Sequence, residues 1–184
     1  MASDTSDAEH LRRFVDDGAE AHFTALVQRH ANLVYGAVLR QLNDPALAQE
    51  VAQNVFVTLA RRAMWLTGHP SLAGWLHRTA VLQARDRFRA EQCRRQREQT
   101  AIELGTAMNL DESLLSSLVP LLDELLLELG AADREALLLR FFANKSLREV
   151  GATLGVREDA AQKRVAKALD ALTERFRRRG FRVA

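Results

Sequence analysis

Apolar side chains recur at three- and four-residue steps through most of the chain, which is the period of amphipathic α-helices. No stretch between turn signals sustains an alternation of apolar and polar residues, so the sequence predicts no strands. The fold class that we expect is therefore all-α.

Three helices are predicted in the first half of the chain, over residues 19–41, 45–62 and 71–98. Asp44 can cap the second of these helices, and Pro45 fits its first turn because a backbone N–H is not needed there. Ser71 follows a Gly-His-Pro break and can cap the third helix. These helices form a first unit.

Residues 99–117 lack clear periodicity and carry only acidic charge, which is typical of a linker or a loosely docked segment. Pro120 then opens a helix that ends at Gly130, and another helix is predicted over 131–142. A second helical unit begins here.

A short helix and a long basic helix follow, with Gly155 between them. Ser146 and Glu149 have the spacing of a capping box at the start of the short helix. The long helix has one apolar face, and its other face carries Gln162, Lys163 and Lys167. This pattern predicts a helix-turn-helix, whose second helix enters the major groove, where Lys meets guanine acceptors and Gln reads adenine. The alternative is an antiparallel helix pair with a glycine turn and no DNA function.

Charge is divided unevenly along the chain. The net charge is +2 overall, but it is −3 over residues 1–18, +5 over 19–98, −6 over 99–130 and +6 over 131–184. Each basic block contains an Arg-rich run that could face phosphates. Arg-rich helix ends are also common as solvated faces, so one run alone would not favour nucleic acid over that interpretation. Two such runs beside a helix-turn-helix pattern favour DNA binding.

The chain offers little for catalysis or metal binding. Cys93 is the only cysteine, and the five histidines show no metal-site spacing, so we interpret them as surface or packing residues. No nucleophile–base pair or glycine-rich phosphate loop is present in the sequence. We expect a protein that is not an enzyme and that has no metal and no cofactor.

No segment of the sequence is long and apolar enough to predict a membrane-spanning helix. The most apolar stretch, 114–129, is interrupted by three acidic residues, and the polar N-terminus lacks the apolar core of a signal peptide. We therefore expect a cytoplasmic protein without membrane insertion.

Three segments resemble those of bacterial RNA polymerase sigma factors of the sigma-70 family. They are, in chain order, DPALAQEVAQNVFVTLA, GWLHRTAVLQARDRFRAEQCRRQRE and LGAADREALLLRFFANKSLREVGATLGVREDAAQKRVAKALDAL. They resemble the core-polymerase-binding helix, the promoter-melting and recognition helix, and the C-terminal helix-turn-helix of that family. The resemblance covers about residues 19–98 and 118–179, and it is closest to the extracytoplasmic-function group (group 4), which keeps only these two domains.

The resemblance implies a specificity subunit that binds the clamp helices and flap of the RNA polymerase core and reads promoter DNA. The polymerase-binding residues that it implies are Glu50, Gln53 and Asn54. The DNA-binding residues are Arg85 and Arg89 in the first unit, and Arg157, Gln162, Lys163, Arg164 and Lys167 in the second. Arg164 could instead bond within its own domain. An anti-sigma factor is a further partner that the resemblance allows, and the two basic units of such proteins often pack together before polymerase binds.

The region that would read the minus-10 element departs from the family pattern. The loop from Met64 to Ser71 corresponds to one that captures a flipped base, and Trp65 could stack on that base or pack in the core. Leu82 stands where many relatives have an Asn that contacts the minus-10 strand, so that role is not transferred.

The domain organisation that we expect has five parts: an acidic segment over 1–18, a sigma region 2-like domain over 19–98, a linker over 99–117, a sigma region 4-like helix-turn-helix domain over 118–179 and a tail over 180–184. The expected function is that of an alternative sigma factor, with region 2 melting and reading the minus-10 element and region 4 reading the minus-35 element. Two alternatives stay open: a helix-turn-helix regulator that does not join polymerase, and a helical adaptor whose Arg faces bind acidic proteins.

Overall fold

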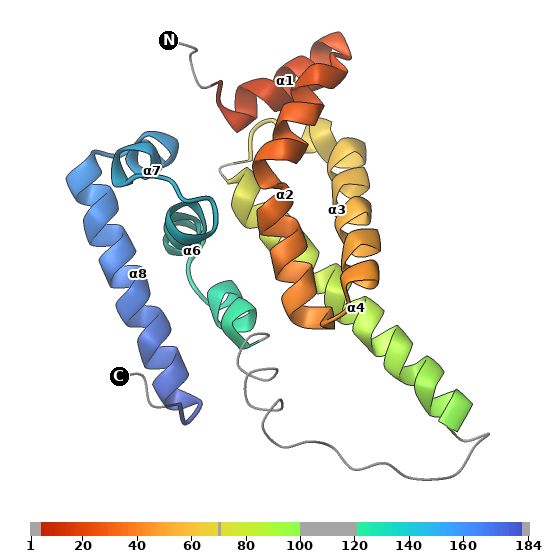
Figure 1. Ribbon diagram of the computed structural model, residues 1–184. Coiled ribbons are helices and arrows are strands. Elements are labelled where there is room, and N and C mark those ends of the chain that lie inside the picture. Colours follow the sequence, from red (N-terminus) through yellow and green to blue (C-terminus); the bar gives the residue numbers. More distant parts are fainter. Residues whose placement is uncertain (1–4, 70, 100–120, 182–184) are drawn as a thin grey trace.

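A computed structural model describes residues 5–69, 71–99 and 121–181 of the chain. All regular elements in these ranges are helices, which confirms the all-α prediction. The helices form two groups that lie side by side (Figure 1). Apart from Gln99, the linker predicted over 99–117 lies outside the described residues.

The N-terminal unit contains four helices: α1 (Asp7–Asp17), α2 (Glu20–Leu42), α3 (Pro45–Leu66) and α4 (Leu72–Gln99). The C-terminal unit begins with a helical segment over 121–127 and continues through α6 (Ala131–Leu137), the π-helical turn η1 (Leu138–Phe142), α7 (Leu147–Leu154) and α8 (Glu158–Arg178). None of the helices in the described ranges is long and apolar enough to span a bilayer.

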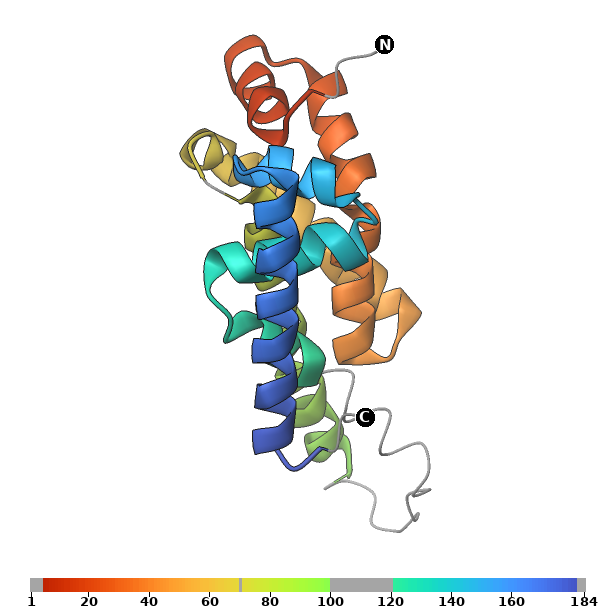
Figure 2. The ribbon, with the colours of Figure 1, turned by 90° about the vertical axis from the view of Figure 1, so that its left-hand side faces the viewer.

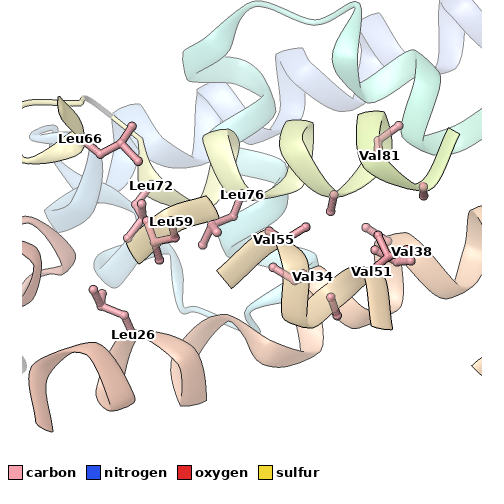
Figure 3. Close-up of a cluster of buried hydrophobic side chains, with 14 of the residues drawn as sticks. Leu26, Val34, Val38, Val51, Val55, Leu59, Leu66, Leu72, Leu76 and Val81 are labelled. Carbon is pink, nitrogen blue, oxygen red and sulfur yellow. The ribbon is translucent and has the colours of Figure 1, made fainter. Parts of the chain in front are cut away.

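One apolar core joins α2, α3 and α4 (Figure 3). Its fully buried members include Leu26 and Val34 of α2, Val55 and Leu59 of α3, and Leu76 of α4. These side chains are the predicted apolar stripes of the three helices, and the stripes face each other.

The boundary between α2 and α3 follows the sequence signals. Asn43 ends α2 in the left-handed conformation, with φ of 49°. Asp44 then accepts hydrogen bonds from the backbone N–H groups of Ala46 and Leu47 at 2.9 and 3.0 Å, as an N-cap residue does. The C-terminal end of α3 differs from the prediction, because the helix continues one turn beyond Arg62 and buries Ala63 and Leu66.

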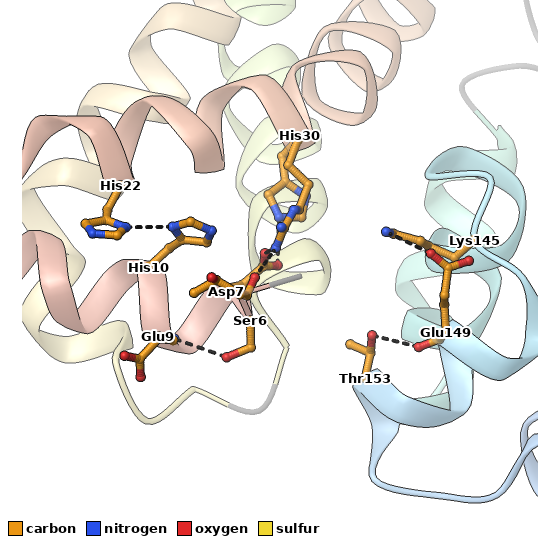
Figure 4. Close-up of polar contacts among 11 residues, drawn as sticks. Ser6, Asp7, Glu9, His10, His22, His30, Lys145, Glu149 and Thr153 are labelled. Carbon is orange, nitrogen blue, oxygen red and sulfur yellow. Dashed lines mark hydrogen bonds and ion pairs between the residues drawn. The ribbon is translucent and has the colours of Figure 1, made fainter. Parts of the chain in front are cut away.

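Helix α1 is an element that the sequence analysis missed, since it falls within the segment described only as acidic. Leu11 is fully buried, and Phe14 and Val15 pack against the core of the N-terminal unit. Asp7 holds the start of α1 on α2 through Arg29 at 2.6 Å and His30 Nε2 at 2.8 Å (Figure 4). The first unit is therefore a four-helix structure.

We expect Asp7→Asn to lower the free energy of unfolding by about 2 kcal/mol at pH 7. Burial raises the pKa of Asp7, but hydrogen bonds and charge from His30 and Arg29 outweigh burial and hold it at about 2, against 3.8 ordinarily. A shift of one pKa unit corresponds to about 1.4 kcal/mol. Because the pKa is depressed in the folded chain, this stability is present above pH 3.8 and is lost as pH falls towards 2.

Urea denaturation at several pH values measures this effect. The Asp7→Asn chain should lose less stability than the wild type between pH 4 and pH 2, whereas Asp17→Asn, at the exposed end of the same helix, should behave as the wild type. Equal acid sensitivity of Asp7→Asn and the wild type would contradict the assignment.

The C-terminal unit has its own apolar core, with Leu125 and Leu126, Leu138 of η1, Val150 of α7 and Ala168 of α8 among its buried members. Figure 1 shows α8 on the outside of the molecule and α6 between α8 and the N-terminal unit, and in the side view of Figure 2 α6 crosses behind α8. The same apolar cluster includes Leu33 of α2 and Ala73 of α4, so the two units share buried surface.

The helix predicted over 131–142 is present, but its last five residues form the wider π-helical turn η1. The N–H of Ala143 donates to the carbonyl of Leu138 at 3.0 Å, five residues back. Leu138 and Leu139 are buried, while Phe142 reaches the N-terminal unit, where the guanidinium of Arg40 lies 4.9 Å from its ring centre. The extra residue in the turn lets this segment bury Leu138 and Leu139 and also place Phe142 against Arg40 of the N-terminal unit.

Candidate nucleic-acid interface

Helices α7 and α8 form the predicted helix-turn-helix. The capping box at the start of α7 is complete: Ser146 Oγ accepts from the N–H of Glu149, and the Glu149 carboxylate accepts from the N–H of Ser146 at 2.7 Å. The Ser146 hydroxyl also donates to the Glu149 carboxylate at 2.7 Å, and this bond, the bond from the Ser146 N–H and the Lys145 amine lower the pKa of Glu149 to about 2. Figure 4 shows Glu149 between Lys145 and Thr153 at the edge of this unit.

Two glycines shape the turn between α7 and α8. Gly155 ends α7 in the left-handed conformation, with φ of 67°, which glycine adopts without strain. Gly151 lies where the chain folds back on the helix, because a Cβ atom there would stand 2.7 Å from the carbonyl oxygen of Val156. The absence of a side chain at Gly151 thus permits the close approach of the two helices.

The outer face of α8 presents the predicted recognition residues. Gln162, Lys163 and Lys167 are all exposed, while Ala161, Val165 and Ala168 on the opposite face are buried. Lys163 and Lys167 are four residues apart and so lie on one face of the helix, and the exposed Gln162 lies about 100° round the helix from Lys163, at the border of that face. This surface can contact the base edges and phosphates of a DNA groove.

The other two predicted residues of this unit have different positions. Arg157 is exposed at the N-cap position of α8, beside the recognition face. Arg164 is half-buried, and its Nε lies 3.9 Å from a carboxylate oxygen of Asp133 in α6. Arg164 therefore faces its own domain, as the sequence alternative allowed.

The two predicted DNA-binding residues of α4 also differ from one another. Arg89 is exposed on the outer half of the helix. Arg85 forms an ion pair of 2.7 Å with Glu124 of the C-terminal unit. One basic side chain is thus available in this arrangement, and the other is occupied by a carboxylate of the same chain.

The predicted polymerase-binding residues Glu50, Gln53 and Asn54 are exposed on one face of α3. A carboxylate oxygen of Glu50 lies 3.8 Å from the guanidinium of Arg87 in α4. Val57, one turn further on the same face, is an exposed apolar side chain. The exposed face of α3 is therefore polar and includes one apolar side chain, Val57. This composition suits a protein–protein contact.

The region around Met64 to Ser71 differs in part from the predicted loop. Met64 and Trp65 lie in the last turn of α3, and the Trp65 side chain is 85% exposed, so it does not pack in the core. Trp75, by contrast, packs against the core of the N-terminal unit. Leu82 is 44% exposed, so its apolar side chain forms part of the surface of α4.

The contact between the two units contains a buried carboxylate that the sequence analysis did not identify. Asp123 is fully buried, accepts from His77 Nε2 at 2.9 Å, and accepts from Arg40 Nε and Nη2 at 2.9 and 2.8 Å. Burial raises the pKa of Asp123, but the hydrogen bonds from His77 and Arg40 outweigh burial and hold it below its usual value. The bidentate Arg40–Asp123 pair joins α2 to the segment 121–127.

A second buried carboxylate lies at the first turn of α4. Glu135 of α6 accepts from the hydroxyl of Ser71 and from the N–H of Gly74, the latter at 3.0 Å. Its side chain is only 3% exposed, and burial raises its pKa despite these hydrogen bonds. Ser71 thus caps α4, as predicted, and also binds the other unit.

The sequence indicates surface or packing roles for the histidines, and two of the histidines have a more specific role. His77 and His30 are buried and each donates to a carboxylate, Asp123 and Asp7 respectively. Each carboxylate is distant in sequence, so local periodicity could not pair them. Among the residues that the structure describes, no cluster of three or more His, Cys, Asp or Glu side chains could hold a metal ion.

Two family profiles match the chain, in the order of its two units. The profile described as Sigma-70 region 2 matches residues 26–94, and the one described as Sigma-70, region 4 matches residues 121–172.

The chain is also similar to individual sigma factors and to one solved structure. The chain is 32% identical over 162 residues to RNA polymerase sigma factor CarQ of Myxococcus xanthus, covering 86% of this chain and 91% of the relative. It is 35% identical over 95 residues to the ECF RNA polymerase sigma factor SigK of Mycobacterium sp. (strain KMS), covering 51% of this chain and 49% of the relative. A solved structure of CnrH in complex with the cytosolic domain of CnrY matches with a TM-score of 0.44 and 21% identity, covering 91% and 95% of the two chains.

Proposed function

Because the chain belongs to the sigma-70 family of RNA polymerase sigma factors, in the extracytoplasmic-function group, we propose that it directs the polymerase core to promoters through the two surfaces described above. The region 2-like domain, residues 19–98, melts and reads the minus-10 element. The region 4-like domain, residues 118–179, reads the minus-35 element. The core enzyme supplies the catalysis of RNA synthesis in the cytoplasm, and this chain supplies the choice of start site.

The observation that carries this proposal is the exposed face of α8, with Gln162, Lys163 and Lys167 on one surface of a helix-turn-helix. Lys and Gln side chains at this position can contact guanine and adenine edges in the major groove. Arg157 at the start of α8 can add a phosphate contact, and Arg164 supports the helix from behind through Asp133. A steep fall of affinity with salt follows from the phosphate contacts.

In the N-terminal unit the DNA contacts are Arg85 and Arg89 on α4, together with the exposed Trp65 at the end of α3. Extruding a base from the duplex costs a few kcal/mol, and the exposed indole in the last turn of α3 offers a stacking surface that recovers part of it. The Leu82 side chain, which lacks hydrogen-bonding groups, adds an apolar contact here in place of base readout.

Run-off transcription with purified core polymerase tests the function. The full chain should produce transcripts that start at defined positions on DNA fragments from its own genome, and the core alone should not. Duplex binding without any transcript would favour the regulator that does not join polymerase, which the matches to both regions do not favour. Binding that is insensitive to salt would favour the adaptor.

Glu50→Ala combined with Asn54→Ala should weaken association with core polymerase about tenfold, because both side chains lie on the exposed face of α3 and a hydrogen bond to a charged group contributes about 1.5–3 kcal/mol. Fluorescence anisotropy of the chain labelled at Cys93 measures the affinity. Gln28→Ala, at an exposed position of α2, is the matched control and should leave it unchanged. Unchanged affinity of the double variant would remove α3 from the polymerase contact.

A further inference from the structure

An alanine lies within the surface of α8 that carries the polar recognition residues. Ala166 is exposed, and it follows Gln162 by four residues and Lys163 by three. Successive residues of an α-helix are rotated by about 100°, so Ala166 lies about 40° round the axis from Gln162 and about 60° from Lys163. Its side chain therefore stands in the sector between these two polar side chains, about one turn further along the helix.

The side chain of Ala166 points away from the core of its own unit. The buried side of α8 includes Ala161, Val165 and Ala168, and Ala166 lies about 100° or more round the axis from each of them. Figures 1 and 2 show α8 on the outside of the molecule. Packing therefore does not require an alanine at this position, and the sector that it occupies is open to a DNA groove.

Two exposed carboxylates mark where the DNA-binding surface ends along this side of α8. Asp170 lies one turn beyond Ala166, and Glu174 lies one turn beyond Asp170. Carboxylates repel the phosphates of a DNA backbone, because like charges brought together cost free energy. Ala166 precedes both carboxylates and has Lys163 and Lys167 beside it, so it lies within the basic part of the helix.

The size of the alanine side chain decides which group of a base it can contact. Gln162 and Lys163 have long side chains, whereas Ala166 ends at Cβ, so the backbone of α8 can approach the base edges closely at this residue. Among the four bases, thymine alone presents a methyl group in the major groove, at C5. A polar edge opposite Ala166 would lose its water without gaining a partner, which lowers affinity. An apolar contact with a thymine methyl avoids this loss.

We propose that Ala166 determines base specificity, through contact of its Cβ with the C5-methyl group of a thymine in the major groove. One turn of helix advances by 5.4 Å and adjacent base pairs are about 3.4 Å apart, so this thymine lies within about two base pairs of the pair that Lys163 contacts. The assignment rests on the function proposed above, because it takes α8 as the helix that enters the groove.

Replacement of single thymines by uracil tests the contact, because uracil keeps every hydrogen-bonding group of thymine and lacks only the methyl group. The full chain is bound to core polymerase, and fluorescence anisotropy measures its affinity for an upstream duplex from a mapped promoter. Each thymine of the duplex is replaced in turn. At one thymine the replacement should lower affinity about fourfold, as expected when the apolar contact of one methyl group is lost.

The variant Ala166→Gly removes the Cβ that makes the contact. It should bind the thymine duplex about fourfold more weakly than the wild type and should no longer distinguish thymine from uracil at the sensitive position, which is the coupling that a double-mutant cycle measures. Ala160→Gly is the matched control, because Ala160 is also exposed on α8 but lies outside the sector between Gln162 and Lys163. This control should keep the fourfold difference.

If Ala166→Gly fails to fold by circular dichroism, Ala166→Gln replaces it, since glutamine has a high helix propensity. This variant should also lose the difference between thymine and uracil. The proposal is overturned if no thymine is sensitive in the wild type, or if a folded Ala166 variant keeps the fourfold difference.

Run-off transcription separates this proposal from the proposed function. Transcripts from a mapped start site together with insensitivity to uracil would remove the thymine contact alone. If no transcript forms, the function fails, and a duplex that the full chain selects from a random pool then serves for the same uracil replacements. A sensitive thymine in that duplex, lost in Ala166→Gly, would support the contact without polymerase.

Discussion

Replacing Lys163 and Lys167 together with alanine is expected to weaken binding of duplex promoter DNA about a hundredfold. Both side chains are exposed on the outer face of α8, and a Lys contact with a base or a phosphate contributes about 1–3 kcal/mol. A hundredfold loss corresponds to about 2.7 kcal/mol. Anisotropy titration with a duplex taken from a mapped promoter gives the affinity, and the slope of its logarithm against log salt should fall by about 2 if both lysines contact phosphates.

The same double variant should bind core polymerase as the wild type does, since the α3 face is in the other unit. Glu158→Ala/Asp170→Ala changes two exposed residues of α8 without removing a cation and serves as a control for the integrity of the helix. Equal losses of DNA and polymerase binding would indicate misfolding. Full DNA affinity in the folded double variant would show that α8 does not enter the groove.

Gly151→Val is expected to lower the stability of the C-terminal unit by about 3 kcal/mol and to abolish duplex binding at 37 °C. A Cβ at residue 151 would lie 2.7 Å from the carbonyl oxygen of Val156 and 3.3 Å from the carbonyl carbon of Arg157, and both are backbone atoms of the turn. Overpacking costs about 1–3 kcal/mol, and the upper end applies because a backbone cannot rotate away as a side chain can.

Thermal denaturation followed by circular dichroism measures the effect of Gly151→Val. Ala152→Val introduces the same side chain at the exposed neighbouring position of α7 without the clash; it lowers helix propensity slightly and should cost less than about 1 kcal/mol. Similar melting temperatures for the two variants would mean that α7 and the turn do not pack as closely as described.

Elements with an uninterrupted apolar period were predictable from the sequence. The stripes of α2 and α3 and the Ser146–Glu149 capping box lie where the spacing placed them. Helix α1 was missed because Leu11, Phe14 and Val15 are too few, among acidic neighbours, to show a period over a long window. The last turn of α3 was not predicted, because the break at the following Gly-His-Pro sequence was expected to begin after Arg62, whereas the helix continues to Leu66.

The outer faces were also predictable, whereas the contact between the units was not. Gln162, Lys163 and Lys167 face outward because their helix has a single apolar side, which a sequence displays directly. Asp123 and His77 are 46 residues apart, and their pairing depends on how two separately folded units dock. A weak signal existed: Asp123 is one of three acidic residues within a run of leucines, and a polar group in such a run is typical of a buried side chain with a distant partner.

The π-helical turn Leu138–Phe142 bears on how this chain is compared with its relatives and how it can be redesigned. A relative that lacks the additional residue would carry a regular helix here, and every side chain beyond that point would be rotated by roughly 100°. An alignment would show only a one-residue gap. The aromatic ring of Phe142 would then no longer contact Arg40. The two units of such a protein would keep their cores but would lose this contact between them.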